Sequence, residues 1–420
     1  MSLFRSTLSD KSNPRLKRQN PLPPPVTDEE DDGEFNRPNT LRLAAGLLLM
    51  TMLLTAFGLT MLYSASSSNV TAAAAFFTKQ LIWIIVGCFT GIIVFFKGYD
   101  FFCKKSLIWV LGCALLLVWA RLSKEINGAH RWIIVGSFRF QPSELAKIAA
   151  AIFTANYCAE YQRTFNDLTR WKHGIWGIAC GAGLLILLIL IGEDLGTTVL
   201  VASMVFFTMF IGNLKFRYFI IPVTAIPLAV LYIKHFDPMR WGRLTIFMNP
   251  EVNQRAGGYQ LWNSLLALGS GGWSGMHLTE SRLKANYLPE AHTDFIISII
   301  GEELGYLGVL VVIFCYILWG FFAFRIAMTA RNRTGMLLGF ALSLGIVFQA
   351  IINLGVVSGL FPTKGMPAPF ISYGGSNMVC SLLATGFLVS IAMDAWEPDY
   401  PGKVFQQIKK FLMPKFLSGR

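Results

Sequence analysis

The sequence predicts an all-α integral membrane protein with about ten transmembrane helices. Of its 420 residues, 54% are hydrophobic and only 14% are charged, whereas a soluble domain averages about 25% charged residues. Such a chain has to place apolar surface against lipid, where every backbone N–H and C=O must be satisfied within the protein. The apolar residues come in long runs and do not alternate with polar ones, so the strands of a membrane β-barrel are excluded.

The apolar runs define the expected membrane domain, residues 41–393. A span needs about 20 apolar residues, and about 17–25 are common. We expect spans at 41–63, 80–97, 106–120, 141–158, 174–192, 197–213, 217–234, 304–325, 335–358 and 376–393. The long stretch at about 235–303 is expected to be an extracytoplasmic connection between the seventh and eighth spans.

Both ends of the chain are polar. Residues 1–40 combine a basic part, a proline run and an acidic run, so we expect a disordered tail. Lys and Arg gather in the short connections on the same side as this tail, and the opposite connections carry few. The exceptions on the opposite side are Arg121, Lys124, Arg131 and Arg139. The bias predicts that both termini are cytoplasmic, with 394–420 as a second, basic tail.

The formal net charge of +12 is explained by this flanking of the spans and by attraction to anionic lipid. The sequence contains no aromatic and basic module of the kind that binds nucleic acid, so we expect no nucleic-acid partner. The seven cysteines form no Cys-x-x-Cys pair, and the five histidines show no ligand spacing. We interpret the cysteines as buried small hydrophobic residues and not as disulfides or metal ligands.

Ionisable residues at the mouths of the expected spans are the candidates for chemistry. Each charge costs about 2.5–3.5 kcal/mol at the centre of a membrane helix, so it needs a partner or a purpose. Glu144 and Lys147 stand at i, i+3 at the start of the fourth span, where they can pair on one helix face. Asp194 follows the fifth span and can cap the helix of the sixth. Further candidates on the same side are Arg131, Arg243, Lys364 and Ser372. In the expected topology all of them lie at the outer face of the membrane.

Asp294 is the candidate that best fits a catalytic base. It follows Glu290 and His292 and begins an apolar run, and the start of a helix favours the ionised form of a carboxylate. Structural interpretations stay open for the other candidates. The pair in the fourth span can be an ion pair alone, the carboxylate after the fifth span a helix cap, and Ser372 part of a flexible turn.

Several motifs together resemble the SEDS family (shape, elongation, division and sporulation). In chain order they lie at 128–133, 141–147, 194–197, 258–260, 287–295, 301–305 and 371–376. Alanine stands at position 291, where the family's elongation member tends to carry arginine. Together with the sequence at 362–365, this makes the chain most similar to the division member, and the sporulation member is not excluded. The chain departs from the family pattern at Gly192-Glu193 and at 277–281.

The resemblance implies a peptidoglycan glycosyltransferase of the bacterial cytoplasmic (inner) membrane. Such enzymes polymerise lipid II, the undecaprenyl-diphosphate-linked disaccharide-peptide, at the outer leaflet. The division member does so during septal wall synthesis, with a cognate class B penicillin-binding protein that crosslinks the strands and with other division proteins. Asp294 matches the family's essential aspartate, and Glu144 with Lys147 matches a polar pair in its central cavity.

As a hypothesis for mechanism, Asp294 accepts the proton of the attacking sugar hydroxyl, with His292 as an orienting neighbour. A positioned base of this kind contributes about 10²–10⁴-fold. Arg243, Lys364, Lys147 or a divalent cation such as Mg²⁺ or Mn²⁺ would stabilise the leaving diphosphate. One alternative is a lipid II flippase, which should need polar groups through the midplane, where the sequence has few. The other is a scaffold of the division machinery, which would leave Asp294 without a task.

Overall fold

The structure is a computed structural model of the chain. It describes residues 37–67, 70–123, 130–136, 138–162, 174–236, 238–252, 258–281, 292–398 and 400–403. The predicted N-terminal tail therefore lies outside the described residues, except for 37–40, which already belong to the first helix. The predicted C-terminal tail is described only as far as residue 403.

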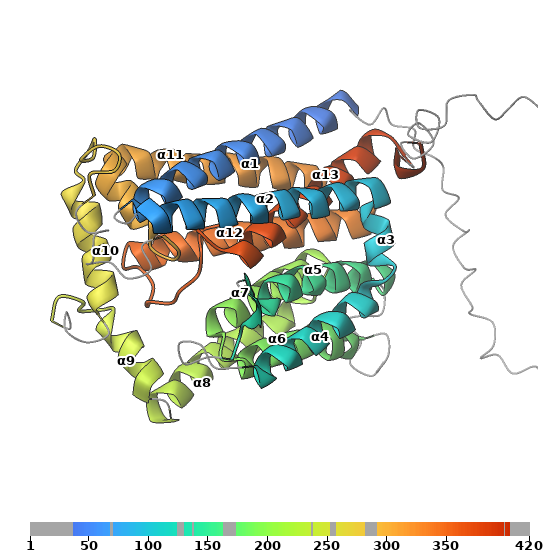
Figure 1. Ribbon diagram of the computed structural model, residues 1–420. Coiled ribbons are helices and arrows are strands. Elements are labelled where there is room, and N and C mark those ends of the chain that lie inside the picture. Colours follow the sequence, from blue (N-terminus) through green and yellow to red (C-terminus); the bar gives the residue numbers. More distant parts are fainter. Residues whose placement is uncertain are drawn as a thin grey trace, which may run out of the picture. The chain divides into compact units, whose positions relative to one another are not determined.

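The described part of the chain is mostly helical (Figure 1). Its long helices are α1 (Arg37–Ser66), α2 (Val70–Lys97), α4 (Ser106–Leu122), α5 (Pro142–Glu160), α6 (Ile175–Ile191), α7 (Leu195–Ile211), α8 (Ile220–Phe236), α11 (Ile296–Met328), α12 (Arg333–Val357) and α13 (Gly375–Trp396). Shorter helices are α3 (Tyr99–Cys103), η2 (Phe216–Phe219), α9 (Pro238–Ile246) and α10 (Tyr259–Ser270). Two antiparallel strands, β1 (Ile133–Val135) and β2 (Phe138–Phe140), form a hairpin with Ile133 opposite Phe140.

Each of the ten predicted spans overlaps one of these long helices. By length and composition, α1, α2, α11, α12 and α13 can cross a membrane, and α4, α6 and α7 are shorter apolar helices. The prediction of a helical membrane protein is thus confirmed in outline. The full number of spans and the placement of the termini stay predictions.

Some helices extend beyond the predicted spans. Helix α2 begins at Val70 and not at residue 80, because the alanine-rich start of this segment is weakly hydrophobic but strongly helix-forming. The predicted connection at 235–303 contains α9, α10 and the start of α11. The β1–β2 hairpin was not predicted, since strands of three residues are too short to show an alternating pattern.

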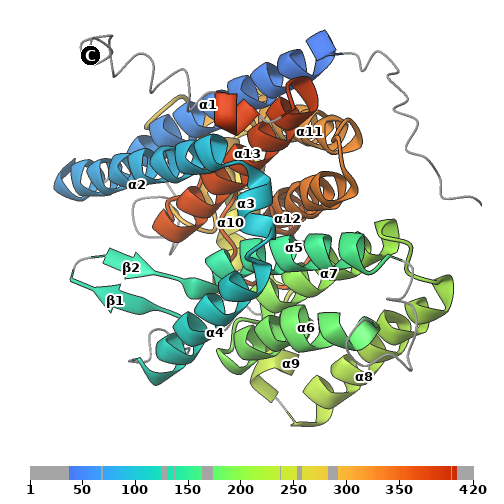
Figure 2. The same ribbon diagram turned by 90° about the vertical axis from the view of Figure 1, so that its right-hand side faces the viewer.

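The helices pack in two groups with α12 between them (Figure 1, Figure 2). One group consists of α1, α2, α11 and α13, and the other of α4, α5, α6 and α7. Helix α12 contacts α11 and α13 on one side and α5 and α7 on the other. The central position of α12 explains why its polar residues reach both groups.

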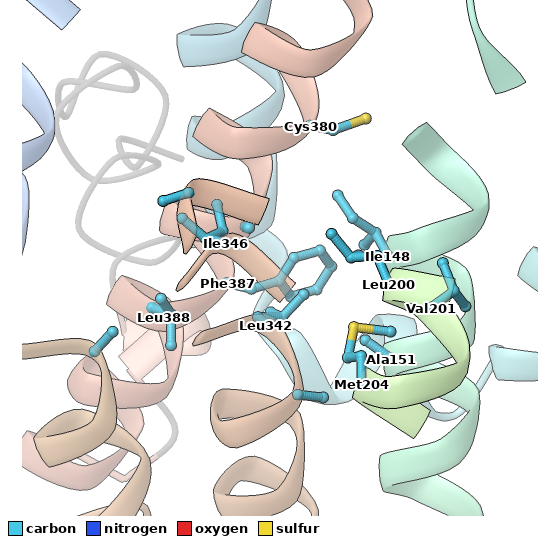
Figure 3. Close-up of a cluster of buried hydrophobic side chains, with 14 of the residues drawn as sticks. Ile148, Ala151, Leu200, Val201, Met204, Leu342, Ile346, Cys380, Phe387 and Leu388 are labelled. Atoms are coloured by element: carbon cyan, nitrogen blue, oxygen red, sulfur yellow. The ribbon is translucent and has the colours of Figure 1, made fainter. Parts of the chain in front are cut away.

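The core at this junction is built from apolar side chains of four helices (Figure 3). They include Ile148 and Ala151 of α5, Leu200, Val201 and Met204 of α7, Leu342 and Ile346 of α12, and Phe387 of α13. Lipid tails are as apolar as these side chains, so close packing and not the hydrophobic effect has to hold such helices together.

Helix α11 is broken at Gly305, whose φ of 69° and ψ of −169° are open mainly to glycine. The loop after α10 fills the break, because Gly272 accepts a hydrogen bond from Tyr306 N at 2.8 Å and Met276 N donates to Glu302 O at 3.0 Å. Ser264 of α10 also bonds Ser298 of α11 at 2.7 Å. These contacts fix the first turns of α11, directly after Asp294.

Helices α2 and α13 approach each other at glycines. A Cβ added at Gly386 would lie 2.6 Å from Cα and 2.9 Å from the carbonyl oxygen of Gly91. The two backbones are therefore in direct contact, as is common where small residues face each other in membrane helix pairs.

We expect Gly386→Ala to lower the free energy of unfolding by about 1–3 kcal/mol, because the new methyl group meets backbone atoms that cannot rotate away. Thermal unfolding of the purified protein in detergent measures the change. Gly112→Ala in α4 is the control, since a Cβ there meets no heavy atom within 4 Å. Equal melting temperatures for the two variants would contradict the close helix contact.

Candidate functional site

Four segments that are distant in sequence come together at one end of the helix bundle. They are the start of α5, the turn between α6 and α7, residues 292–295 before α11, and the connection between α12 and α13. Most of the predicted site residues lie on these segments. Glu290 lies outside the described residues, and Arg243 lies on α9, where its side chain is not described.

Asp194 is a buried carboxylate with several hydrogen-bond partners. It is only 3% exposed, and its Oδ2 accepts hydrogen bonds from Gln141 Nε2 and Ser143 Oγ, both at 2.9 Å. Its Oδ1 accepts the N–H of Thr197 at 3.4 Å and lies 3.5 Å from Nζ of Lys364. The predicted capping of the sixth span is confirmed, and the same carboxylate also links α5 to the α12–α13 connection.

The charge of Asp194 follows from these contacts. Burial by itself raises the pKa of the carboxyl group. The positive charges of Lys364 and Arg131 and the hydrogen bonds from Thr197 and Ser143 together lower the pKa by more than burial raises it. The net pKa lies below the ordinary value for an aspartate, so Asp194 is ionised at neutral pH. An ionised buried carboxylate holds a cation strongly, and the nearest one on the α12–α13 connection is Lys364.

Gly196 makes room for this cation. A Cβ at Gly196 would lie 2.8 Å from Cε of Lys364 and 3.0 Å from Sδ of Met366. The Asp-Leu-Gly-Thr sequence at 194–197 therefore supplies a carboxylate for the lysine, a glycine over which the lysine runs, and a threonine N–H for the cap.

Glu144 and Lys147 form the ion pair that their spacing predicted. Lys147 Nζ donates to Glu144 Oε2 at 2.8 Å and to Gln349 Oε1 at 2.6 Å. Both side chains of the pair are buried, and such a pair is tolerated only where further hydrogen bonds satisfy it. Gln349 continues the network, because its Nε2 donates to Pro367 O and to Asn377 Oδ1, each at 2.9 Å.

Asp294 is half-buried in the turn before α11. Its carbonyl oxygen accepts a hydrogen bond from Asn353 Nδ2 at 2.9 Å. Its carboxylate occupies the space into which a Cβ at Gly365 would project. The structure therefore places this carboxylate directly against the segment that carries Lys364.

His292 lies among aromatic rings. Its imidazole packs against Phe76 with ring centroids 4.5 Å apart and lies 5.8 Å from the ring of Tyr373. Its carbonyl oxygen accepts the N–H of Tyr373 at 3.0 Å. These contacts tie the segment that carries Asp294 to the end of the α12–α13 connection, and the predicted orienting role of His292 stays a prediction.

Both the hydroxyl and the carbonyl oxygen of Ser372 accept hydrogen bonds from other parts of the protein. The residue is fully buried, and its hydroxyl accepts the N–H of Ala368 at 2.8 Å. Its carbonyl oxygen accepts Gln80 Nε2 at 3.2 Å. These bonds tie the predicted turn before the tenth span to Ala368 and to Gln80 of α2.

The network also contains four amide side chains that were not among the predicted site residues: Gln141, Gln349, Asn353 and Asn377. The predicted candidates at the span mouths were mainly ionisable groups, whereas these residues are neutral. Gln349 and Asn353 stand one turn apart within an otherwise apolar helix. Buried amides in membrane helices also need partners, so extending the same search to uncharged polar residues would have found them.

The predicted divalent cation has no preformed protein cage in the described part of the chain. Within it, no group of three or more His, Cys, Asp or Glu side chains is arranged to hold a metal ion. Phosphate-bound Mg²⁺ usually keeps several waters and uses only one or two carboxylates. A cation carried in with a diphosphate substrate therefore stays a prediction.

The family model described as cell cycle protein, for FtsW, RodA and SpoVE, matches residues 44–396 of this chain. A probable peptidoglycan glycosyltransferase FtsW from Trichlorobacter lovleyi is 35% identical over 354 residues, which cover 82% of this chain and 92% of that protein. The protein of the same name from Taylorella equigenitalis is 37% identical over 324 residues, or 75% and 87% of the two chains.

Solved structures share the fold. One comes from work on structural coordination of polymerization and crosslinking by a peptidoglycan synthase complex. It superposes with a TM-score of 0.71 at 24% identity, over 84% of this chain and 98% of that one. The crystal structure of the rod shape determining protein RodA from Thermus thermophilus gives a TM-score of 0.61 at 24% identity, over 84% and 97%. Together with the matched family model, these likenesses confirm the resemblance that the motifs indicated: the chain belongs to the FtsW/RodA/SpoVE family.

Proposed function

We propose that this chain is a peptidoglycan glycosyltransferase that polymerises lipid II into glycan strands, with Asp294 as the general base. The observation that carries the proposal is the contact between the Asp294 carboxylate and Gly365, next to Lys364. A proton acceptor and a cation thus stand on adjoining surfaces, as a glycosyl transfer from a diphosphate requires. The names of the curated relatives support the same activity.

In the reaction, a sugar hydroxyl attacks the anomeric carbon of the sugar that is linked to undecaprenyl diphosphate. A glycosidic C–O bond forms, the C–O bond to the diphosphate breaks, and the hydroxyl proton passes to Asp294. A positioned carboxylate base contributes about 10²–10⁴-fold to such a step. The leaving diphosphate departs with its electron pair and needs positive charge beside it.

Lys364 suits this task better than Lys147. The side chain of Lys364 is 22% exposed, whereas that of Lys147 is 10% exposed. Lys364 is therefore the more accessible of the two cations to phosphate oxygens. Lys147 is bonded to both Glu144 and Gln349 inside the bundle. Arg131, which is half-buried near Asp194, and Arg243 of α9 are further candidates for the diphosphate.

We also propose ten spans with both termini in the cytoplasm of a bacterium. This topology turns the starts of α5, α7, α11 and α13 toward the outer face of the inner membrane, and the site lies at those starts. The polyprenyl tail of lipid II would remain in the outer leaflet, between helices and membrane lipid.

The proposed partner is a class B penicillin-binding protein that crosslinks the new strand at the division septum, together with other division proteins. The solved peptidoglycan synthase complex supports a partner of this kind in outline.

Asp294→Asn tests the proposal. The amide keeps the shape of the side chain but cannot accept the proton, so we expect at least about 10²-fold less polymer from lipid II. Glycan chains made by the purified protein with its penicillin-binding partner are measured on gels, beside the wild type.

Three results would contradict the proposal. Equal polymer from both proteins would remove Asp294 as the base. Lipid II that crosses vesicle membranes without any polymer would favour a flippase, and neither activity in the wild type would favour a scaffold.

Gly365→Ala should lower the rate without unfolding the protein. The new methyl group would displace the Asp294 carboxylate, which belongs to a side chain and not to the backbone. We expect a turnover reduced about 10-fold or more and an unchanged melting temperature, with Gly112→Ala as the control. An unchanged turnover would separate the position of Asp294 from catalysis.

A further inference from the structure

Asn353 of α12 joins two segments of the site through one nitrogen atom. Its Nδ2 donates to the carbonyl oxygen of Asp294 at 2.9 Å and to that of Met366 at 2.7 Å. The residue is 1% exposed. Both hydrogens of the amide group are therefore used, each for a different segment.

We propose that Asn353 is a positioning residue that fixes the proton acceptor Asp294 for glycosyl transfer. The inference rests on the proposed function, because it assigns a role in the same reaction. Asn353 does not touch the substrate and acts through the backbone of Asp294.

Two constraints meet at Asp294. The hydrogen bond from Asn353 holds its backbone, and Gly365 bounds the space of its carboxylate. Gly365 directly precedes Met366, whose carbonyl oxygen is held by the same Nδ2. The amide group of Asn353 therefore holds in place both the backbone of Asp294 and the segment against which the Asp294 carboxylate lies. A catalytic group needs this kind of support, since its productive geometry tolerates errors of only about 0.5 Å.

The oxygen atom of the Asn353 amide, Oδ1, lies in a different environment from Nδ2. Among the described residues, Oδ1 of Asn353 has no hydrogen-bond partner, although it is buried. A buried polar atom without a partner destabilises a fold. The two hydrogen bonds that Nδ2 donates to the carbonyl oxygens of Asp294 and Met366 therefore explain the asparagine at this position.

Gln349 supports the same loop one helical turn earlier. Its Nε2 donates to the carbonyl oxygen of Pro367 at 2.9 Å, next to the carbonyl that Asn353 holds. Through Oε1 it also accepts Lys147. Two amide side chains of α12 thus hold residues 366–367 by hydrogen bonds, and of these two only Asn353 also bonds Asp294.

The test compares Asn353→Asp and Asn353→Leu with the wild type, each purified with the penicillin-binding partner. The first keeps the shape and cannot donate two hydrogen bonds, and the second removes the donors without burying a charge. We expect kcat for lipid II polymerisation to fall about 10²-fold, with KM and the stoichiometry of lipid II binding within about 2-fold of the wild type.

Asn263→Asp on α10 is the matched control. It makes the same chemical change at a buried amide, whose Nδ2 bonds, among the described residues, only Tyr259 O of its own helix. We expect its kcat to equal that of the wild type.

Each other outcome overturns the inference. A folded Asn353→Leu protein with normal kcat shows that the bond is not needed. A loss of rate that matches the loss of lipid II binding sites shows a purely structural role. If the wild type makes polymer and only the Asn353 result disagrees, the proposed function stands and the positioning role falls. If the wild type itself makes no polymer, the proposed function fails first and this inference with it.

Discussion

Polar groups inside an apolar helix bundle can be satisfied only by one another, and the candidate site is arranged around this constraint. Asp194 accepts hydrogen bonds from Gln141 and Ser143 and pairs with Lys364, and Lys147 donates hydrogen bonds to Glu144 and Gln349. None of these groups could be removed alone without leaving a buried charge or a buried donor. The network therefore determines how the two helix groups on either side of α12 are joined at this end of the bundle.

The network also separates two kinds of charge. The Glu144–Lys147 pair is buried and bonded on both sides, which suits a structural role within the bundle. The side chain of Lys364 is more exposed than that of Lys147, which suits a cation that meets an anionic substrate. Asp294 lies against the same connection as Lys364. The proposed chemistry thus uses the more exposed cation, while the buried pair supports the helix bundle.

The sequence predicted the helices well because long apolar runs leave few alternatives in a membrane. It predicted Asp194, Asp294 and the Glu144–Lys147 pair as candidates because charges at span mouths are rare and need a reason. Motif resemblance added the family, which composition and periodicity could not supply. The junction of four segments could not be predicted, since it depends on which helices pack together and on glycines that admit Lys364 and the Asp294 carboxylate. The neutral amides of α12 were not predicted, because the candidates were chosen mainly among ionisable residues.

We propose that Asp294 and Lys364 serve one reaction centre. A structure of the Asp294→Asn protein with its penicillin-binding partner and bound lipid II, determined by electron cryomicroscopy, tests this directly. We expect diphosphate oxygens within about 3.2 Å of Lys364 Nζ, and an acceptor sugar hydroxyl at a similar distance from the side chain of residue 294. A diphosphate bound away from the connection between α12 and α13, with residue 294 facing no sugar, would contradict it.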